Sequence, residues 1–225
     1  MSGRRSKGLI VAIDGPSGAG KSTAAKALAQ RLGYTFIDTG AMYRALAWKA
    51  LQRGVFLDDG KQLAALLRGT RIELVEGGRG VRLDGTDVTE AIRTREVSAA
   101  ASHVSAHPAV RREMVARQQA LGREGGVVLD GRDIGSAVFP DAEVKFYVDA
   151  DPKARARRRH AELSEKGPSP SVAEIEREIH AREKKDSTRG DSPLTRTPDA
   201  VSIDTTTLSP EGVVLRMLEV VASQR

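Results

Sequence analysis

A glycine-rich segment near the start of the sequence has the residue types and spacing of a phosphate-binding loop. Residues 15–22 read GPSGAGKS and match the pattern G-x-x-x-x-G-K-S/T. In such a loop the backbone N–H groups wrap a phosphate, the lysine reaches the β- and γ-phosphates, and the hydroxyl binds Mg²⁺. We therefore expect a nucleoside triphosphate site formed by Gly15, Pro16, Ser17, Gly18, Ala19, Gly20, Lys21, Ser22 and Thr23.

The residues on either side of the loop predict the strand and the helix that it requires. The apolar run 9–13 indicates a buried strand, and residues 23–32 are rich in helix formers. A helix that begins at the loop directs its positive dipole end towards a bound phosphate. A glycine-rich turn that matched the pattern by chance would lack this context.

Composition excludes several classes of protein. The chain has no Cys, which excludes disulfides and thiolate chemistry, and His103, His107, His160 and His180 are too scattered to suggest a metal site. No apolar run approaches the ~20 residues of a membrane helix, so we expect a cytoplasmic protein that does not associate with membranes. The net charge is +6 and residues 1–7 form a basic arm, but Lys and Arg are dispersed and aromatic residues are few. We expect no nucleic-acid binding, and a monomer.

Further strands are predicted at 34–38, 127–130, 143–149 and 200–204, and the residues after them are candidates for a second ligand site. In an open α/β sheet, ligands bind beyond the carboxyl ends of the strands. Residues 38–44 (DTGAMYR) follow the second strand and run into a helix at 45–51; they could hold a ligand, or Thr39 could cap that helix and leave Arg44 solvated. Asp130 ends the third strand, where P-loop enzymes often place a Mg²⁺ ligand.

Two segments interrupt this strand and helix pattern. In the inserted segment, 58–126, we expect a helix at 62–67, a hairpin of 71–76 and 81–84 with a turn at 77–80, and helices at 94–106 and 108–121. In the lid segment, 152–192, one helix starts at Pro152, residues 166–170 break it, and Ser171 and Glu174 form a capping box for the next. Its arginines suit a lid over a phosphate donor, and a solvated helical hairpin is the alternative. Ser209 is expected to cap the last helix.

The reaction class follows from what is present and what is missing. A chain without Asn cannot carry the Asn-Lys-x-Asp motif of guanosine-specific P-loop proteins. If the acceptor is itself a phosphate, with a second pKa of about 6, it is largely ionised at neutral pH and needs no general base. Arginines that hold the donor and acceptor phosphates close together would then suffice for transfer, because the guanidinium group binds phosphate in a bidentate manner and is always charged.

Five motifs, in this order along nearly the whole chain, resemble the bacterial cytidylate kinases: 15–22, 38–44, 92–97 (IRTREV), 130–135 (DGRDIG) and 203–208 (IDTTTL). The resemblance implies the P-loop nucleoside monophosphate kinase fold, an α/β fold with a five-stranded parallel sheet flanked by helices. The chain would be a single domain, 1–225, with 58–126 as the acceptor-binding subdomain and 152–192 as the lid. ATP with Mg²⁺ would be the donor, and CMP or dCMP the acceptor, giving CDP or dCDP.

The resemblance also implies residue roles. Lys21, Arg132, Arg182 and Arg189 would be catalytic, and Ser22 and Asp130 would serve the metal. Acceptor phosphate would be held by Thr39, Arg44, Arg132, Arg182 and Arg189, the sugar by Asp186, and the base by Ser102, Arg111 and Asp133. Tyr43 would shape this pocket, and Arg158 would lie near ATP. A P-loop kinase of another small acceptor, such as UMP or shikimate, is the alternative; a kinase of shikimate type should not need the inserted segment.

Overall fold

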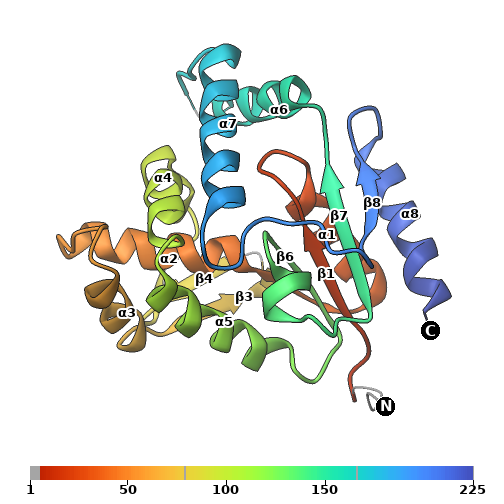
Figure 1. Cartoon of the computed structure of the whole chain (residues 1–225), viewed down its shortest axis with the longest axis horizontal. Helices are drawn as coiled ribbons and strands as arrows, with labels where there is room; N and C mark the ends of the chain where they lie inside the picture. Colours follow the sequence, from red (N-terminus) through yellow and green to blue (C-terminus); the bar gives the residue numbers. More distant parts are fainter. Residues whose placement is uncertain (1–5, 79, 166, 225) are drawn as a thin grey trace.

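The computed structural model describes residues 6–224 except 79 and 166, and a five-stranded sheet forms its centre (Figure 1). The strands lie in the order β2-β6-β1-β7-β8, and all neighbours are parallel. Their bounds are β1 Ile10–Asp14, β2 Thr35–Asp38, β6 Val127–Gly131, β7 Val144–Asp149 and β8 Val201–Asp204. The five predicted strands are therefore confirmed, and their carboxyl ends share one edge of the sheet.

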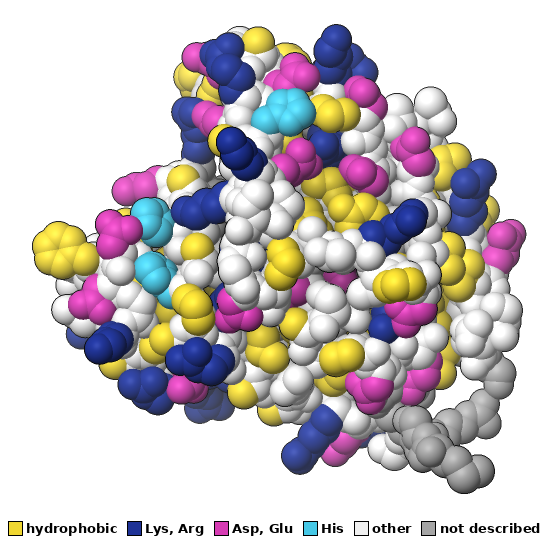
Figure 2. All heavy atoms as spheres, in the orientation of Figure 1, with side chains coloured by type: hydrophobic (Ala, Val, Ile, Leu, Met, Phe, Trp, Pro, Cys, Tyr) yellow, Lys and Arg dark blue, Asp and Glu magenta, His cyan; other side chains and the backbone are white. Residues whose placement is uncertain are grey.

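The lid segment forms two helices, α6 (Pro152–Ser164) and α7 (Val172–Thr188), which project from this edge (Figure 1). They pack on each other through a small apolar cluster of their own, made by Ala156, Ile175 and Ile179. Figure 2 shows acidic and basic side chains side by side on this projecting part. The predicted capping box at Ser171 and Glu174 is confirmed, while Lys166, in the predicted break, lies outside the described residues.

The inserted segment combines helices with a second, smaller sheet. Its elements are α3 (Gly60–Arg68), β3 (Ile72–Val75), β4 (Gly80–Leu83), β5 (Thr86–Asp87), α4 (Arg95–Val104) and α5 (Pro108–Gly122), with short 3₁₀ turns at Glu76–Gly78 and Ala91–Arg93. The predicted hairpin is confirmed as the antiparallel pair β3–β4, although residue 79 of its turn lies outside the described residues. Strand β5 was not predicted; it pairs with β4 across a tight turn at Asp84 and Gly85, whose φ angles are 51° and 87°.

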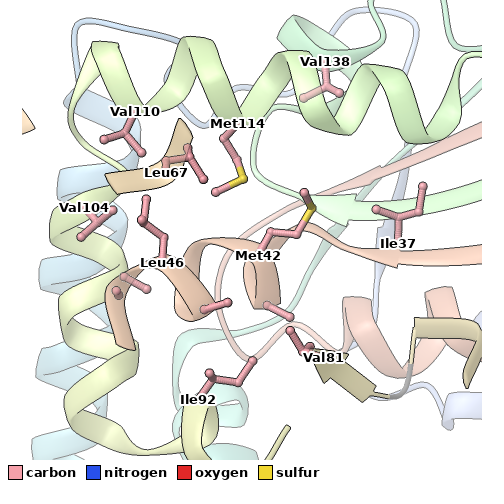
Figure 3. Packing of buried hydrophobic residues seen from close by; sticks show 14 of the residues in the cluster. Ile37, Met42, Leu46, Leu67, Val81, Ile92, Val104, Val110, Met114 and Val138 are labelled. Carbon is pink, nitrogen blue, oxygen red and sulfur yellow. The ribbon is translucent and has the colours of Figure 1, made fainter. Parts of the chain in front are cut away.

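Two apolar clusters cover the two faces of the large sheet, because successive residues of a strand face opposite sides. Ile10 of β1 belongs to one cluster and Val11 to the other. The cluster of Val11 is completed by α1 (Lys21–Leu32) and by α8 (Pro210–Ser223), which Ser209 caps as predicted. The cluster of Ile10 is completed by α2 (Thr39–Gln52) and by the inserted segment, and Figure 3 shows their side chains converging.

Among the described residues, no helix combines the length and the apolar content needed to cross a bilayer. Residues 1–5 of the basic arm lie outside the described part of the chain.

Candidate active site

The glycine-rich loop joins β1 to α1 and has the backbone conformation that its glycines permit. Gly15 has a φ of 145°, and a Cβ atom there would lie 1.9 Å from the carbonyl oxygen of Val148. Gly20 has a φ of 85° and is the N-cap of α1, without a side chain to cap the helix. The first N–H groups of α1 are thus left for a ligand, and Ser22 and Thr23 beside them are exposed.

Lys21 lies inside the curve of this loop. Its Nζ donates a hydrogen bond to the carbonyl oxygen of Pro16 at 2.5 Å, and the residue is 5% exposed. Burial, followed by the nearby charge of Arg132, lowers the pKa of Lys21 well below its usual value, while Asp130 and Asp14 oppose the shift. The ammonium group is therefore held where a polyphosphate would sit, in surroundings that lack enough negative charge to balance it.

Asp130, at the end of β6, faces the loop from the neighbouring strand. Its Oδ2 accepts a hydrogen bond from the Ser22 hydroxyl, and its Oδ1 is buried without a hydrogen-bond partner in the described part of the chain. Burial, followed by the charge of Asp38, raises the pKa of Asp130 to about 6. A hydroxyl beside an under-satisfied carboxylate is an oxygen donor set that fits Mg²⁺. Asp130 thus lies at the end of a core strand, as predicted, and beside Ser22 of the phosphate-binding loop.

The motif at 38–44 forms the first turns of α2, which begins at Thr39 and not at Ala45 as predicted. Asp38 caps the helix by accepting from the Ala41 N–H at 2.7 Å, and it pairs with Arg44 at 3.1 Å. The alternative in which Thr39 is the cap and Arg44 is solvated is therefore wrong. The Thr39 hydroxyl instead donates to the Asp130 carbonyl at 2.6 Å, which places it beside the loop.

The arginines of the lid segment meet those of the sheet edge around Asp186 of α7. Asp186 is 5% exposed, and its Oδ2 lies 3.1 Å from Arg132 Nε and 3.9 Å from Arg182 Nε. Burial, followed by Arg132, lowers the pKa of Arg182 to about 10, so this arginine keeps its charge at neutral pH. Several buried guanidinium nitrogens lack a hydrogen-bond partner among the described residues: Arg44 Nε, Arg111 Nε, Arg182 Nε and Arg189 Nη2.

A second polar group lies next to this one and contains most of the predicted base-reading residues. Asp133 is 6% exposed and accepts a hydrogen bond from Arg111, which is 2% exposed. Arg189 Nη2 lies 3.7 Å from Asp133, and the Tyr43 hydroxyl lies 3.5 Å from Arg111 Nη1. Ser102 is half-buried in α4, and its hydroxyl has no hydrogen bond to Arg111 or Asp133 within the described residues. Of the three predicted base-reading residues, Ser102 is thus the one that no hydrogen bond of the described residues joins to the other two.

On the other side of the loop, Arg158 of α6 contacts the residues that follow β8. It donates to Thr205 Oγ1 at 3.0 Å and to the Thr205 carbonyl at 2.5 Å. The Thr205 hydroxyl in turn donates to the carbonyl of Ala19 in the loop at 3.0 Å. Arg158 is therefore connected to the loop through one residue, Thr205.

Sequence reasoning missed three residues that support the site. Thr205 has just been described. Arg155 of α6 is 3% exposed; it donates to the Ser17 carbonyl at 3.3 Å and pairs with Glu183 of α7. Asp14, at the end of β1, accepts two backbone hydrogen bonds from Ile134 and Gly135. Two of them had a signal in the sequence: Thr205 lies in the motif 203–208, and Asp14 lies at the carboxyl end of an apolar strand, the argument already used for Asp130.

A family model and several curated relatives with the same description match nearly the whole chain. The family model described as cytidylate kinase matches residues 11–223. The cytidylate kinase of Geobacillus sp. (strain WCH70) is 53% identical over 215 residues, covering 95% of this chain and 96% of that one. The cytidylate kinase of Bacillus subtilis (strain 168) is 51% identical over 217 residues, covering 96% and 97%. The solved shikimate kinase from Acinetobacter baumannii in complex with shikimate is similar in fold alone, with a TM-score of 0.50 at 16% identity over 96% of this chain and 94% of that chain.

Proposed function

The chain belongs to the cytidylate kinase family, and from this premise we propose how its residues transfer the γ-phosphoryl group of ATP to CMP or dCMP. The enzyme is an ATP-dependent phosphotransferase. The observation that carries the residue roles is a set of buried guanidinium nitrogens without a hydrogen bond among the described residues, namely Arg44 Nε, Arg182 Nε and Arg189 Nη2. Buried donors without partners are costly to a fold, and a phosphate monoester with several acceptor oxygens would satisfy them.

On the donor side, the loop residues 15–23 bind the ATP phosphates through backbone N–H groups and Lys21. Arg158 lies near the nucleotide through its contacts with the Thr205 region. Ser22 and Asp130 would hold Mg²⁺, which supplies charge neutralisation at the β- and γ-phosphates when bound. Among the described residues there is no cluster of three acidic, His or Cys side chains that could hold a metal unaided, so the phosphates would have to complete such a site.

On the acceptor side, Thr39, Arg44, Arg132, Arg182 and Arg189 bind the CMP phosphate, and Asp186 binds the sugar while it orients two of these arginines. An ionised oxygen of the acceptor phosphate attacks the γ-phosphorus, the bond to the β,γ-bridging oxygen breaks, and ADP leaves. The attacking oxygen carries no proton to remove, so the step needs no general base. Lys21, Arg132, Arg182 and Arg189 stabilise the charge that spreads over the transferred group.

The inserted segment supplies two of the base-reading residues, Ser102 and Arg111, while Asp133 follows β6 and Tyr43 lies in α2. Cytosine has acceptors at its carbonyl and at its unprotonated ring nitrogen, and a donor at its amino group. Arg111 supplies donors, Asp133 supplies an acceptor, and Tyr43 and Ser102 complete the pocket. Uracil reverses two of these groups and would place a carbonyl against the carboxylate of Asp133.

The test is a coupled assay of ADP release with ATP as donor and CMP, dCMP, UMP, AMP, GMP or shikimate as acceptor. We expect kcat/KM for CMP and dCMP to exceed that for UMP by about 10⁴-fold, because a pocket built to hydrogen-bond a substrate rejects its analogue. In Asp133→Ala the gap to UMP should shrink. Comparable efficiency with AMP, GMP or shikimate would overturn the acceptor assignment. A UMP rate near that of CMP would overturn only the account of the pocket.

A further inference from the structure

Asp14 is a buried carboxylate for which the transfer step described above has no use. It is 6% exposed and directly precedes Gly15, the first residue of the phosphate-binding loop. Its Oδ1 accepts a hydrogen bond from the N–H of Ile134 and its Oδ2 from the N–H of Gly135, each at 2.8 Å. Burial nevertheless raises the pKa of Asp14 to about 6. The ionised group therefore lowers the stability of the fold, so stability alone does not explain it.

The two amides that Asp14 binds lie immediately after two residues of the acceptor site. Ile134 and Gly135 open a single π turn, Ile134–Val138, and Arg132 and Asp133 precede it. The same segment leaves β6 at Gly131, which pairs in register with Asp14 itself. The bend at 131–135 is thus attached to β1 twice, by strand pairing at its start and by the carboxylate at its end. Rare π turns are often found at functional sites.

We propose that Asp14 is a positioning residue that fixes Arg132 and Asp133 relative to the phosphate-binding loop. The inference rests on the proposed function, in which Arg132 binds the acceptor phosphate. The connection is short, because Gly15 of the donor loop is covalently joined to the residue that holds the acceptor loop. A displacement of about 1 Å between reacting groups can reduce a rate about 10²-fold. Loss of the two bonds should therefore impair the acceptor side and the transfer step, and spare ATP binding.

A role in stability alone makes a different prediction from a positioning role. A structural residue would lower the melting temperature and the amount of folded enzyme, and the loss would be independent of Arg132. A residue that acts through Arg132 has little left to disturb once that guanidinium is absent. A double-mutant cycle between the two positions separates the cases, because it measures the departure from additivity.

The experiment compares wild type, Asp14→Asn, Arg132→Ala and the double variant. Asn has the shape of Asp, but its NH₂ group would face one of the two amide donors, so at least one bond is lost. Asp199→Asn is the control: Asp199 also ties a loop to the sheet, through Lys145 at 2.7 Å, and it lies at the opposite end of that loop from the acceptor residue Arg189. The readouts are kcat, KM for CMP, the Kd for ATP by calorimetry, and the melting temperature.

We expect Asp14→Asn to lower kcat/KM for CMP about 10²-fold, while the Kd for ATP and the Asp199→Asn kinetics stay close to wild type. In the Arg132→Ala background the same change should cost much less. Multiplicative losses, an equal loss of ATP affinity, or wild-type kinetics in Asp14→Asn would each overturn the proposal.

Two further measurements keep the inference testable. If Asp14→Asn does not fold, Asp14→Ser enters the same cycle, and hydrogen exchange of the wild type is decisive in either case: the amides of Ile134 and Gly135 should exchange slowly. Rapid exchange there would contradict the bonds on which the inference depends. A wild-type enzyme that fails to phosphorylate CMP would instead refute the proposed function, which the comparison of variants does not test.

Discussion

The Lys21 ammonium donates to a carbonyl of its own loop, and this contact shows what a nucleotide would change. A carbonyl offers only a partial negative charge, and burial already lowers the pKa of Lys21. A polyphosphate in the same place would supply full charges and keep the proton on the lysine. The charge is then most valuable when negative charge spreads over the γ-phosphoryl group during transfer.

We expect Lys21→Ala to lower kcat by about 10²- to 10³-fold, the usual cost of removing one group that stabilises transition-state charge. The fold should be retained, as judged by circular dichroism and the melting temperature, because burial already disfavours the charged form of Lys21. Lys26→Ala is the matched control, since Lys26 lies on the exposed face of the same helix and should remain active. Near-wild-type turnover by folded Lys21→Ala would refute the role.

At this scale the sequence predicted the roles of residues in local motifs and missed the roles that depend on distant partners, even for Thr205, which lies in the motif 203–208. The loop residues and Asp130 are recognisable because each ends a strand or follows a known spacing. Asp14 acquires its role from amides 120 and 121 residues away, and Thr205 from a carbonyl 186 residues away. A buried Asp or Thr has many possible partners, and only the folded chain selects one.

The lid segment is joined to the rest of the molecule mainly by polar contacts. Its helices share their own apolar cluster, and the side chains that reach outwards are charged: Arg155 to the Ser17 carbonyl, Asp186 to Arg132, and Glu178 to Arg95 of α4. The Glu178–Arg95 pair is exposed and contributes little, typically below about 1 kcal/mol. Arg155 and Asp186 are buried, and their attachment depends on the charges around them. Such an attachment suits an element that opens and closes as a unit.

We expect ATP and CMP together to slow hydrogen exchange across 152–192, and the free enzyme to exchange there rapidly. Nucleotide phosphates would accept hydrogen bonds from Arg182 Nε and Arg189 Nη2, which have no hydrogen-bond partner among the described residues. Helix α8, which has no part in the site, provides the internal control and should change little. Equal protection with and without nucleotides would identify a fixed helical hairpin and not a lid.

The elements themselves were largely predictable because periodicity and turn residues are local signals. The differences arise where two local signals compete. Asp and Thr are both good N-caps, so the sequence could not decide between Asp38 and Thr39 at the start of α2. Strand β5 has only two residues, and its one signal was the Asp84-Gly85 pair, which is typical of a tight hairpin turn.

For the molecule as a whole, the ionised carboxylate of Asp130 in the site lowers the stability of the fold. The pKa of Asp130 is about 6 in the folded protein, compared with 3.8 for a free side chain. The folded state therefore binds this proton more tightly, and the contribution of Asp130 to the free energy of unfolding falls as pH rises from 3.8 to 6. Above pH 6 the penalty is fully present.

We expect Asp130→Asn to raise the melting temperature at pH 7.5 by about 2–6 °C, which corresponds to roughly 1–2 kcal/mol in a chain of this size. The gain should shrink at pH 4.5, where the wild-type carboxyl is already protonated. Activity should fall at least about 10-fold, because the neutral amide is a poorer partner for Ser22 and Mg²⁺.

Asp199→Asn is the control with the opposite sign. The hydrogen bond from Lys145 lowers the pKa of Asp199, so its ionised form stabilises the fold, and neutralising it should lower the melting temperature slightly at pH 7.5. If Asp130→Asn also lowered the melting temperature at both pH values, the ionised Asp130 could not be a cost to the fold.

The separate apolar cluster of the lid segment has an evolutionary consequence. Among the described residues, Ala156, Ile175 and Ile179 form an apolar cluster within the helical pair, whereas Leu63 and Val104 of the inserted segment share a cluster with Ile10 of the central strand. Recombination could exchange the lid segment between related kinases as a cassette and leave the core intact. The inserted segment cannot be exchanged in this way, because its removal would uncover one face of the sheet. Side chains of that segment that are proposed to contact the acceptor, such as Arg111, can therefore change only while its apolar contacts with the sheet are kept.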